Sequence, residues 1–454
     1  MTRVVVVGGG IAGLTTALTL AERTAGATGI DLREAGDRLG GKLRTTPFAA
    51  RPAVDEGADA FLARVPHATA LACRLGLELT SPRPAGAAVW HHGIHPLPAG
   101  LLLGVPADAF GLARSGLLTW RGKLRAAAEP LLPASDPGDS IGALIRRRFG
   151  GEVHTRLVDA LVGSIYGADT DRFSLAMVPQ LADLAGRGRS LLLSARRMRQ
   201  ASPPRGPVFH APSGGMGALA SAVAAAATAA SVTIRTGAPV AVIERDGRGW
   251  RADGEKATAV VVATPAAPSA PLLAGAAPEL ARLLATIDHA GVALVTVAVG
   301  GWPARLRGLS GYLVPKDVQR TVTAVSFGSQ KWAHWRDDAG AADEVLRISL
   351  GRDGLPVDGL DDDKLVDRAV AEVGGHVGLD LQPGEVRVSR WPDAFPQYRP
   401  GHRDWLAAVA AATPPGVFLT GASYRGIGVP ACIADAETTA ASVAAYLAET
   451  RPEC

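Results

Sequence analysis

The sequence predicts an α/β fold built on a parallel β-sheet, and two segments near the N-terminus carry this prediction. Residues 4–7 are four consecutive valines, and such β-branched runs are typical of strands buried on both faces of a parallel sheet. A glycine-rich turn and an amphipathic helix from residue 14 to 21 follow directly, and a second strand is expected over residues 29–33. Strands that alternate with helices in this way form parallel sheets.

The turn between the first strand and the helix holds Gly8, Gly10 and Gly13 in the spacing G-x-G-x-x-G. The first glycine permits the tight turn, the second lets a pyrophosphate approach the backbone, and the third lets helix and strand pack closely. Glu34 follows the second strand, where a carboxylate binds ribose hydroxyls and disfavours the 2′-phosphate of NADP. Together these features predict a Rossmann-like dinucleotide-binding domain rather than a mere tight turn.

Length and composition set the class of protein. A chain of 454 residues is long enough for two or three domains, and 47% hydrophobic residues favour a packed globular protein. The net charge of +4 does not by itself argue for a nucleic-acid partner. Cys73, Cys432 and Cys454 lie far apart without a C-x-x-C pair, so neither a disulfide framework nor a structural zinc site is expected.

No segment resembles a secretion signal or a membrane span. The N-terminus lacks a long apolar core with a small-residue cleavage site, and no run of about 20 uninterrupted apolar residues occurs. The alanine-rich run 218–230 is too short and too weakly apolar to cross a bilayer. We therefore expect a cytoplasmic protein, soluble or at most peripheral to a membrane.

The residues after Glu34 favour a flavin over a nicotinamide cofactor. Residues 35–42 read A-G-D-R-L-G-G-K, which resembles the glutathione-reductase-like flavoproteins, in particular the amine oxidase and phytoene desaturase branch. A second glycine turn lets the backbone reach an extended cofactor, and Arg38 can pair with phosphate. The alternative is a surface turn rich in Gly and Asp. Residues 54–61 resemble the turn that in this branch brings the backbone near the isoalloxazine. The cofactor implied is FAD.

The resemblance also implies that the FAD-binding domain is discontinuous. In this branch the last strand and helix of the domain come from the C-terminus, and residues 419–422 resemble that strand. A helix is expected from Gly428 and Val429 onward, with its positive N-terminus near the flavin, where it would stabilise the anionic reduced form. In the middle of the chain, residues 231–235 and 259–265 are expected to be strands, and residues 292–299 and 346–350 suit strands of a second, mixed sheet.

Longer segments resemble one family within this branch, the oxygen-dependent protoporphyrinogen/coproporphyrinogen oxidases. Residues 390–402 read R-W-P-D-A-F-P-Q-Y-R-P-G-H, and residues 419–433 read L-T-G-A-S-Y-R-G-I-G-V-P-A-C-I. Shorter matching segments are residues 94–100, 131–134, 146–150, 161–169 and 331–332. The match is collinear over essentially the whole chain, and the bacterial forms of Gram-positive and actinobacterial type, which prefer coproporphyrinogen III, fit best.

This resemblance implies an FAD-dependent, six-electron oxidation of coproporphyrinogen III to coproporphyrin III in haem biosynthesis, with dioxygen as acceptor and hydrogen peroxide as product. The flavin accepts the hydride, so no catalytic side chain and no metal are expected. The expected partners are the porphyrinogen and dioxygen, without nucleic acid; peripheral membrane contact and transient contact with the next haem-pathway enzyme stay open. The alternatives are a protoporphyrinogen IX oxidase, an amine oxidase or carotenoid desaturase, and a porphyrin carrier that retains FAD.

The resemblance assigns the cofactor to the glycine turns, to the turn at residues 57–60 and to the C-terminal segments. The cofactor-binding residues expected are Gly8, Gly10, Ile11, Ala12, Gly13, Glu34, Ala35, Arg38, Gly41, Lys42, Gly57, Ala58, Asp59, Ala60, Val240, Trp391, Gly421, Gly428, Val429, Pro430 and Ile433. The candidates for binding substrate propionates, by chemistry only, are Arg64, Arg172, Lys331 and Tyr398. Some eukaryotic members carry an arginine where this chain has Leu101 and Leu102, so the propionate anchor stays open.

Three parts of the chain are expected. The FAD-binding domain would take residues 1–62, 207–272 and 412–454. A mixed-sheet substrate-binding domain would take residues 63–90 and 273–411, and a helical, membrane-facing insert residues 91–206.

His91, His92 and His95 favour a polar loop over a zinc site, because no fourth ligand pattern accompanies them. The basic runs 146–148 and 196–199 are expected to be solvated helix faces, with attraction to anionic lipid or an acidic partner as the alternative.

Overall fold

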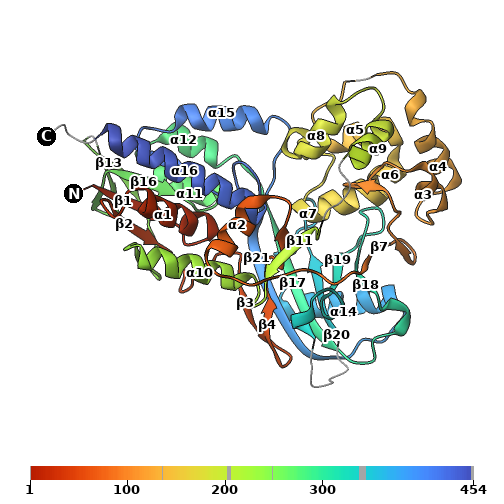
Figure 1. Ribbon diagram of the computed structural model, residues 1–454. Helices are drawn as coiled ribbons and strands as arrows, with labels where there is room; N and C mark the ends of the chain where they lie inside the picture. The colour runs from red at the N-terminus through yellow and green to blue at the C-terminus, as the bar shows by residue number, and fades with distance from the viewer. Residues whose placement is uncertain (1, 135, 202–205, 248, 337–343, 451–454) are drawn as a thin grey trace.

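The computed structural model describes residues 2–134, 136–201, 206–247, 249–336 and 344–450. It shows an α/β protein with two large sheets and a separate group of helices (Figure 1). The first and last described residues lie beside the parallel sheet, and the helices of residues 109–201 lie at the opposite end of the molecule.

A five-stranded parallel sheet has the order β12-β2-β1-β16-β22. Its strands are β1 (Arg3–Val7), β2 (Gly29–Arg33), β12 (Thr233–Arg235), β16 (Ala259–Val262) and β22 (Val417–Leu419). β1 lies at the centre, which explains its four valines: Val4 and Val6 belong to the core on one face, and Val5 and Val7 to the core on the other. The strand order shows that segments from the start, middle and end of the chain build one sheet.

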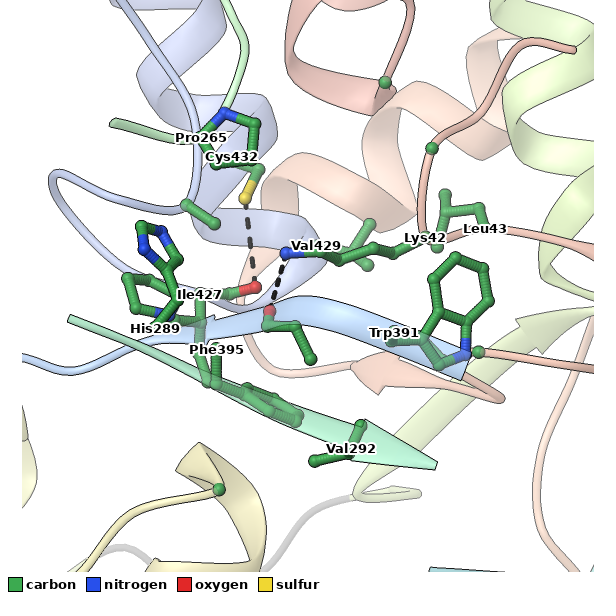
Figure 2. A pocket seen from close by; sticks show the side chains of 18 of the residues that line it. Lys42, Leu43, Pro265, His289, Val292, Trp391, Phe395, Ile427, Val429 and Cys432 are labelled. Atoms are coloured by element: carbon green, nitrogen blue, oxygen red, sulfur yellow. Dashed lines mark hydrogen bonds between the residues drawn. The ribbon is translucent and has the colours of Figure 1, made fainter. Parts of the chain in front are cut away.

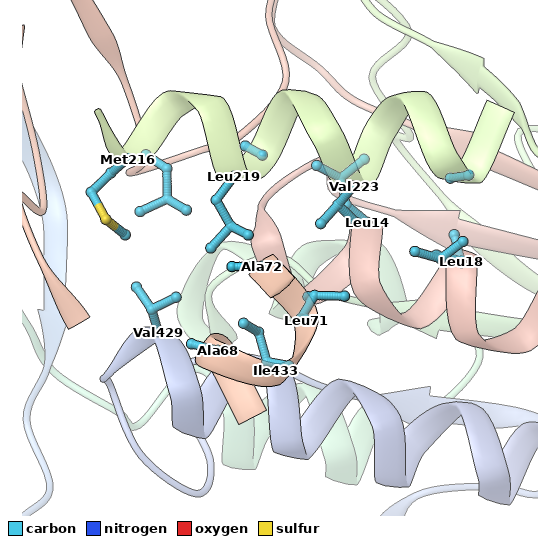
Figure 3. Close-up of a cluster of buried hydrophobic side chains, with 14 of the residues drawn as sticks. Leu14, Leu18, Ala68, Leu71, Ala72, Met216, Leu219, Val223, Val429 and Ile433 are labelled. Atoms are coloured by element: carbon cyan, nitrogen blue, oxygen red, sulfur yellow. The ribbon is translucent and has the colours of Figure 1, made fainter. Parts of the chain in front are cut away.

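Helices cover one face of this sheet. They are α1 (Ile11–Arg23), α10 (Met216–Ala229) and α16 (Val429–Glu449), and α2 (Pro66–Arg74) packs against them. Figure 3 shows Leu14 and Leu18 of α1, Leu219 and Val223 of α10, Ile433 of α16 and Leu71 of α2 converging on one another. The other face packs against β13 (Ile243–Asp246), β14 (Gly249–Ala252), β15 (Glu255–Ala257), α11 (Ala266–Leu273), α12 (Pro278–Leu284) and α15 (His402–Ala412).

Three helices do not follow the domain limits expected from the sequence. α2, α12 and α15 come from segments assigned to the substrate-binding domain, yet they pack into the cores on the two faces of the parallel sheet. The limits of the three parts therefore stay a prediction, although the α/β class and the two kinds of sheet are observed.

The second sheet has seven strands in the order β21-β17-β20-β19-β18-β7-β8. They are β7 (Gly86–Trp90), β8 (Ile94–Pro96), β17 (His289–Val299), β18 (Leu309–Leu313), β19 (Val322–Phe327), β20 (Glu344–Leu350) and β21 (Pro383–Pro396). The pair β18–β7 is parallel and the others are antiparallel, so the sheet is mixed. α14 (Asp362–Val377) packs on it, and the strands expected at residues 292–299 and 346–350 are confirmed as β17 and β20.

The helical region contains α3 (Ala109–Arg114), α4 (Trp120–Ala127), α5 (Ile141–Phe149), α6 (Gly151–Val153), α7 (Ser164–Tyr166), α8 (Pro179–Gly186) and α9 (Leu191–Ala201). Between α6 and α7 the chain forms a π-helix, His154–Gly163, which is unusually long at 10 residues. Short pairings complete the fold: β3 (Thr45–Phe48) with β4 (Arg51–Asp55), β5 (Phe61–Leu62) and β6 (Leu79–Thr80) with β11 (Phe209–Pro212), and β9 (Leu101–Leu102) with β10 (Val105–Pro106). Within the described ranges, no helix combines the length and apolarity needed to cross a bilayer.

Candidate active-site cavity

A cavity of about 570 Å³ lies where the two sheets and the helical region meet. Four neighbouring strands of the parallel sheet end at it, because Gly8, Glu34, Ala263 and Gly421 follow β1, β2, β16 and β22 and all line its wall. The carboxyl edge of a parallel sheet is the usual place for a nucleotide cofactor. The cavity continues from this edge along β17 and β21 toward the π-helix.

The first glycine turn leaves space at the cavity. Gly8 has φ +107°, a conformation that favours glycine, and a Cβ at Gly10 would meet no atom within 4 Å. A Cβ at Gly13 would instead lie 2.0 Å from the carbonyl oxygen of Gly8. Gly10 thus faces open space where a phosphate group would fit, and Gly13 permits the close packing of α1 on the turn.

Glu34 is held by backbone N–H groups. Gly9 N donates to Glu34 Oε2 at 2.7 Å, and Gly36 N donates to Glu34 Oε1 at 2.8 Å. The carboxylate keeps acceptor capacity toward the cavity, as ribose hydroxyls require. In the second glycine turn, Arg38 Nη2 donates to Gly41 O at 2.7 Å, so the guanidinium supports the turn and does not line the cavity.

The turn at residues 57–60 is fixed by a buried charge cluster. Asp59 Oδ2 accepts from Lys331 Nζ at 2.6 Å and lies 3.1 Å from Arg347 Nη2, and Arg347 Nη1 donates to Gly57 O at 2.9 Å. Burial alone would raise the pKa of Asp59, but Arg347 and Lys331 hold it well below its ordinary value. A Cβ at Gly57 would lie 2.1 Å from Lys42 O, so only glycine fits there.

The side chain of Lys42 forms part of the cavity wall, and its amino group is buried. Its Nζ donates to Ala394 O at 2.6 Å, and burial lowers its pKa to about 8 (Figure 2). Cys432 lies nearby on α16, and burial raises the pKa of its thiol to about 12. At neutral pH the cavity therefore faces a mostly protonated amine and a neutral thiol.

The turn that follows β22, residues 420–422, is held by hydrogen bonds from side chains outside the turn. Asp435 Oδ2 accepts from Gly421 N at 3.0 Å and from Thr420 Oγ1 at 2.9 Å. The hydroxyl of Tyr398, a fully buried residue, donates to Ala422 O. α16 begins at Val429, which lines the cavity, so the positive end of this long helix faces the same space as the N-terminus of α1.

The remaining wall is largely apolar. Val292, Leu294, Val314, Phe395 and Ile427 line it, together with the small residues Ala160, Gly163 and Gly167 of the helical region. Arg352 also lines the cavity, and both its terminal nitrogens lie 3.0 Å from the carboxylate oxygens of Asp159 in the π-helix. A glycine-lined cradle with two helix N-termini thus opens directly into an apolar chamber.

The family model for flavin containing amine oxidoreductases matches residues 11–444, a range that holds every residue of the cavity lining except Gly8 and Gly10. The chain belongs to this family. The flavin expected from the sequence is confirmed, and the glycine cradle, the open space at Gly10 and the carboxylate of Glu34 fit an FAD.

Individual members of the family give closer similarity. Coproporphyrinogen III oxidase of Mycobacterium tuberculosis (strain ATCC 25618 / H37Rv) is 36% identical, with 96% of each chain covered. The Bacillus subtilis (strain 168) protein of the same name is 27% identical, with 98% of each chain covered. A crystal structure assigned to a protoporphyrinogen oxidase of Exiguobacterium sp. 255-15 superposes with a TM-score of 0.86 and is 28% identical, covering 98% of this chain and 99% of the other.

In this flavin-containing oxidoreductase, about half of the residues expected at the cofactor line the cavity. They are Gly8, Gly10, Ile11, Ala12, Glu34, Gly41, Lys42, Gly57, Ala58, Trp391, Gly421 and Val429. The other expected cofactor residues lie outside the lining: Gly13, Ala35, Arg38, Asp59, Ala60, Val240, Gly428, Pro430 and Ile433. Their roles toward the cofactor stay predictions.

The four substrate candidates do not line the cavity either. Lys331 pairs with Asp59, Arg172 pairs with Asp353, Tyr398 is buried, and Arg64 is exposed. Sequence reasoning missed Arg347, Arg352 and His289, which do line it. Arg347 lies within a strand that was expected from the sequence. Because side chains alternate between the two faces of a strand, the sequence could have indicated which residues of that strand share a face with Arg347.

Proposed function

We propose that this flavin-containing oxidoreductase uses FAD and dioxygen to oxidise coproporphyrinogen III to coproporphyrin III, a step of haem biosynthesis. The observation that carries the proposal is the charge of the cavity wall. Its lining cations are Lys42, Arg347 and Arg352, and its only lining carboxylate among the described residues is Glu34, at the nucleotide end. The partners of the two arginines, Asp59 and Asp159, do not line the cavity. Such a wall suits an apolar tetrapyrrole with anionic propionates. It does not suit the ammonium group of an amine, which argues against the amine oxidase alternative.

The protein's part in this reaction is to bind, orient and exclude water. Bound FAD supplies the acceptor for hydride. The apolar residues of β17 and β21 would cover the reacting carbon, and Arg347 lines the same cavity. Protoporphyrinogen IX, with fewer propionates, is the alternative substrate of the same cavity.

The proposal is tested by mixing the purified FAD-loaded protein with coproporphyrinogen III without oxygen. We expect the flavin absorbance to bleach, and porphyrin fluorescence and hydrogen peroxide to appear when oxygen is admitted. Protoporphyrinogen IX and putrescine serve as comparison substrates. Bleaching by putrescine alone would refute the proposal, and an unreactive flavin would favour the porphyrin carrier.

We also propose peripheral contact with an anionic membrane surface through α3 and α4. Phe110 and Trp120 are each 67% exposed and Leu124 is 61% exposed, which is unusual for large apolar side chains. Arg114 and Arg121 lie over the rings of Phe110 and Trp120, at 5.2 and 5.3 Å. Apolar side chains flanked by cations match a headgroup layer, and each cation near such a surface contributes about 1 kcal/mol.

The double variant Trp120→Ser/Leu124→Ser is expected to bind vesicles of phosphatidylglycerol and phosphatidylcholine at least about tenfold more weakly, since each apolar group contributes roughly 1.5–3 kcal/mol when buried. Flotation of the protein with vesicles measures the effect. Val242→Ser, at a residue 37% exposed in another part of the molecule, is the control. Equal flotation of all three proteins would contradict the proposal. A cytoplasmic location stays a proposal. A transient contact with the next haem-pathway enzyme stays a proposal too, and we assign no surface of the protein to it.

A further inference from the structure

The ionisable side chains of the cavity wall have sharply different abilities to accept a proton. Within the described residues they are Glu34, Lys42, His289, Arg347, Arg352 and Cys432. Arginine stays protonated at any physiological pH. Lys42, with its pKa of about 8, is mostly an ammonium at neutral pH, and the Cys432 thiol holds its proton up to a pKa of about 12.

Two candidates then remain, and geometry separates them. Glu34 lies at the end of β2, where its two oxygens accept N–H groups of the glycine turns. His289 is the first residue of β17 and pairs with Pro396 of β21, and both residues line the cavity, as does the apolar Phe395. In Figure 2 its ring lies near Ile427. Among the described lining residues, His289 is therefore the proton acceptor that the glycine turns do not engage.

The hydrogen bonds of His289 leave one ring nitrogen available. Its Nε2 lies 3.5 Å from Ser423 Oγ, which itself accepts the N–H of Ala266 at 3.0 Å. The Ser423 hydroxyl can therefore donate to Nε2 in the tautomer that carries its proton on Nδ1, and in that tautomer Nε2 has a lone pair. At 3.5 Å this bond is weak and a substrate N–H can replace it.

Burial keeps the ring neutral, and the charges around it act in both directions. Burial lowers the pKa of His289 below its ordinary value of 6.5, and Lys42 lowers it further, whereas Asp393 of β21 and the neighbouring Asp288 raise it. The Cys432 thiol of α16 is uncharged. At pH 7 the imidazole is thus unprotonated, the state that a general base needs.

We propose that His289 accepts the pyrrole proton that leaves in each two-electron step of porphyrinogen oxidation; this rests on the proposed function. A methylene C–H bond and a pyrrole N–H bond break, and a double bond forms in the tetrapyrrole. The hydride goes to the flavin and the proton to His289 Nε2. Dioxygen then takes both electrons and both hydrogens as hydrogen peroxide, which returns the imidazole to its neutral form.

The test compares wild type with His289→Ala and His289→Gln, both loaded with FAD, in anaerobic bleaching by coproporphyrinogen III across a pH series. The wild-type bleaching rate should fall about tenfold per pH unit below the pKa of His289 and level off above it. Both variants should be slower by roughly 10²–10⁴-fold and lack this inflection. Added imidazole should restore part of the rate in His289→Ala only. His67→Ala, at a histidine outside the cavity on α2, should behave as wild type.

The outcomes separate this inference from the proposed function. If wild type bleaches but His289→Ala keeps the same plateau and inflection, water takes the proton and the inference is wrong. If coproporphyrinogen III does not bleach wild type, the proposed function itself fails. Should His289→Ala lose its flavin, His289→Gln carries the test, because it keeps a hydrogen-bonding group toward Ser423 but cannot take a proton.

Discussion

Gly10→Val is expected to give a folded protein that retains no flavin. Gly10 has φ −72° and ψ 175°, values that valine adopts readily, and a Cβ there meets only open space in the cavity. The added methyl groups would therefore occupy the place of the pyrophosphate without disturbing the fold. Visible absorbance of the purified protein measures flavin retention, and thermal unfolding of the flavin-free proteins measures stability.

The neighbouring Gly13→Ala provides the contrast. Its Cβ would lie 2.0 Å from Gly8 O, so the backbone of the turn must shift, and we expect a loss of about 3 kcal/mol in the free energy of unfolding. Gly275→Val, at a surface turn where a Cβ also meets no atom within 4 Å, should change neither property. A Gly10→Val protein that stays yellow at full occupancy would show that the phosphates lie elsewhere.

Asp159→Ala is expected to destabilise the protein by about 3–5 kcal/mol. Asp159 is fully buried in the π-helix, and its loss leaves the guanidinium of Arg352 without its partner. Thr170 loses an acceptor for both its N–H and its hydroxyl at the same time. Denaturant unfolding of the flavin-free proteins gives the value.

The double variant Asp159→Ala/Arg352→Met should recover part of this loss, because no buried charge remains unpaired. Asp183→Ala, which breaks the exposed pair with Arg187, should change stability little and is the control. Burial would raise the pKa of Asp159, but Arg352 holds it below its ordinary value, so the stabilisation is present at neutral pH and is lost as pH falls through that lowered pKa. Equal losses in the single and double variants would mean that packing, not charge, is responsible.

The sequence predicted the first glycine turn well because its signals are local. Valines that suit a central strand, glycines at fixed spacing and an acidic residue after the next strand lie within about one βαβ unit, and the structure brings Gly8, Gly10 and Glu34 to one cavity. The C-terminal strand and helix carry weaker local signals. They were placed by resemblance alone.

Side chains whose partners are distant in the sequence could not be placed. Arg172 and Lys331 were candidates for anionic substrate groups, yet each pairs with a carboxylate far along the chain, Asp353 and Asp59. Nothing near a lysine or arginine in the sequence reveals such a partner. The π-helix was missed too: its Asp159 pairs with Arg352, which is 193 residues away in the sequence, and no local pattern had indicated such a helix.

The position of β22 and α16 in the cofactor sheet has a consequence for how the protein is made. On the ribosome, β1 emerges first, and β22 emerges roughly twenty to eighty seconds later at ordinary rates of translation. Until the last helix has left the exit tunnel, one side of the flavin cradle is missing. Cofactor uptake therefore has to wait until α16 has been made, and until then the apolar face of α1 that packs against α16 stays uncovered.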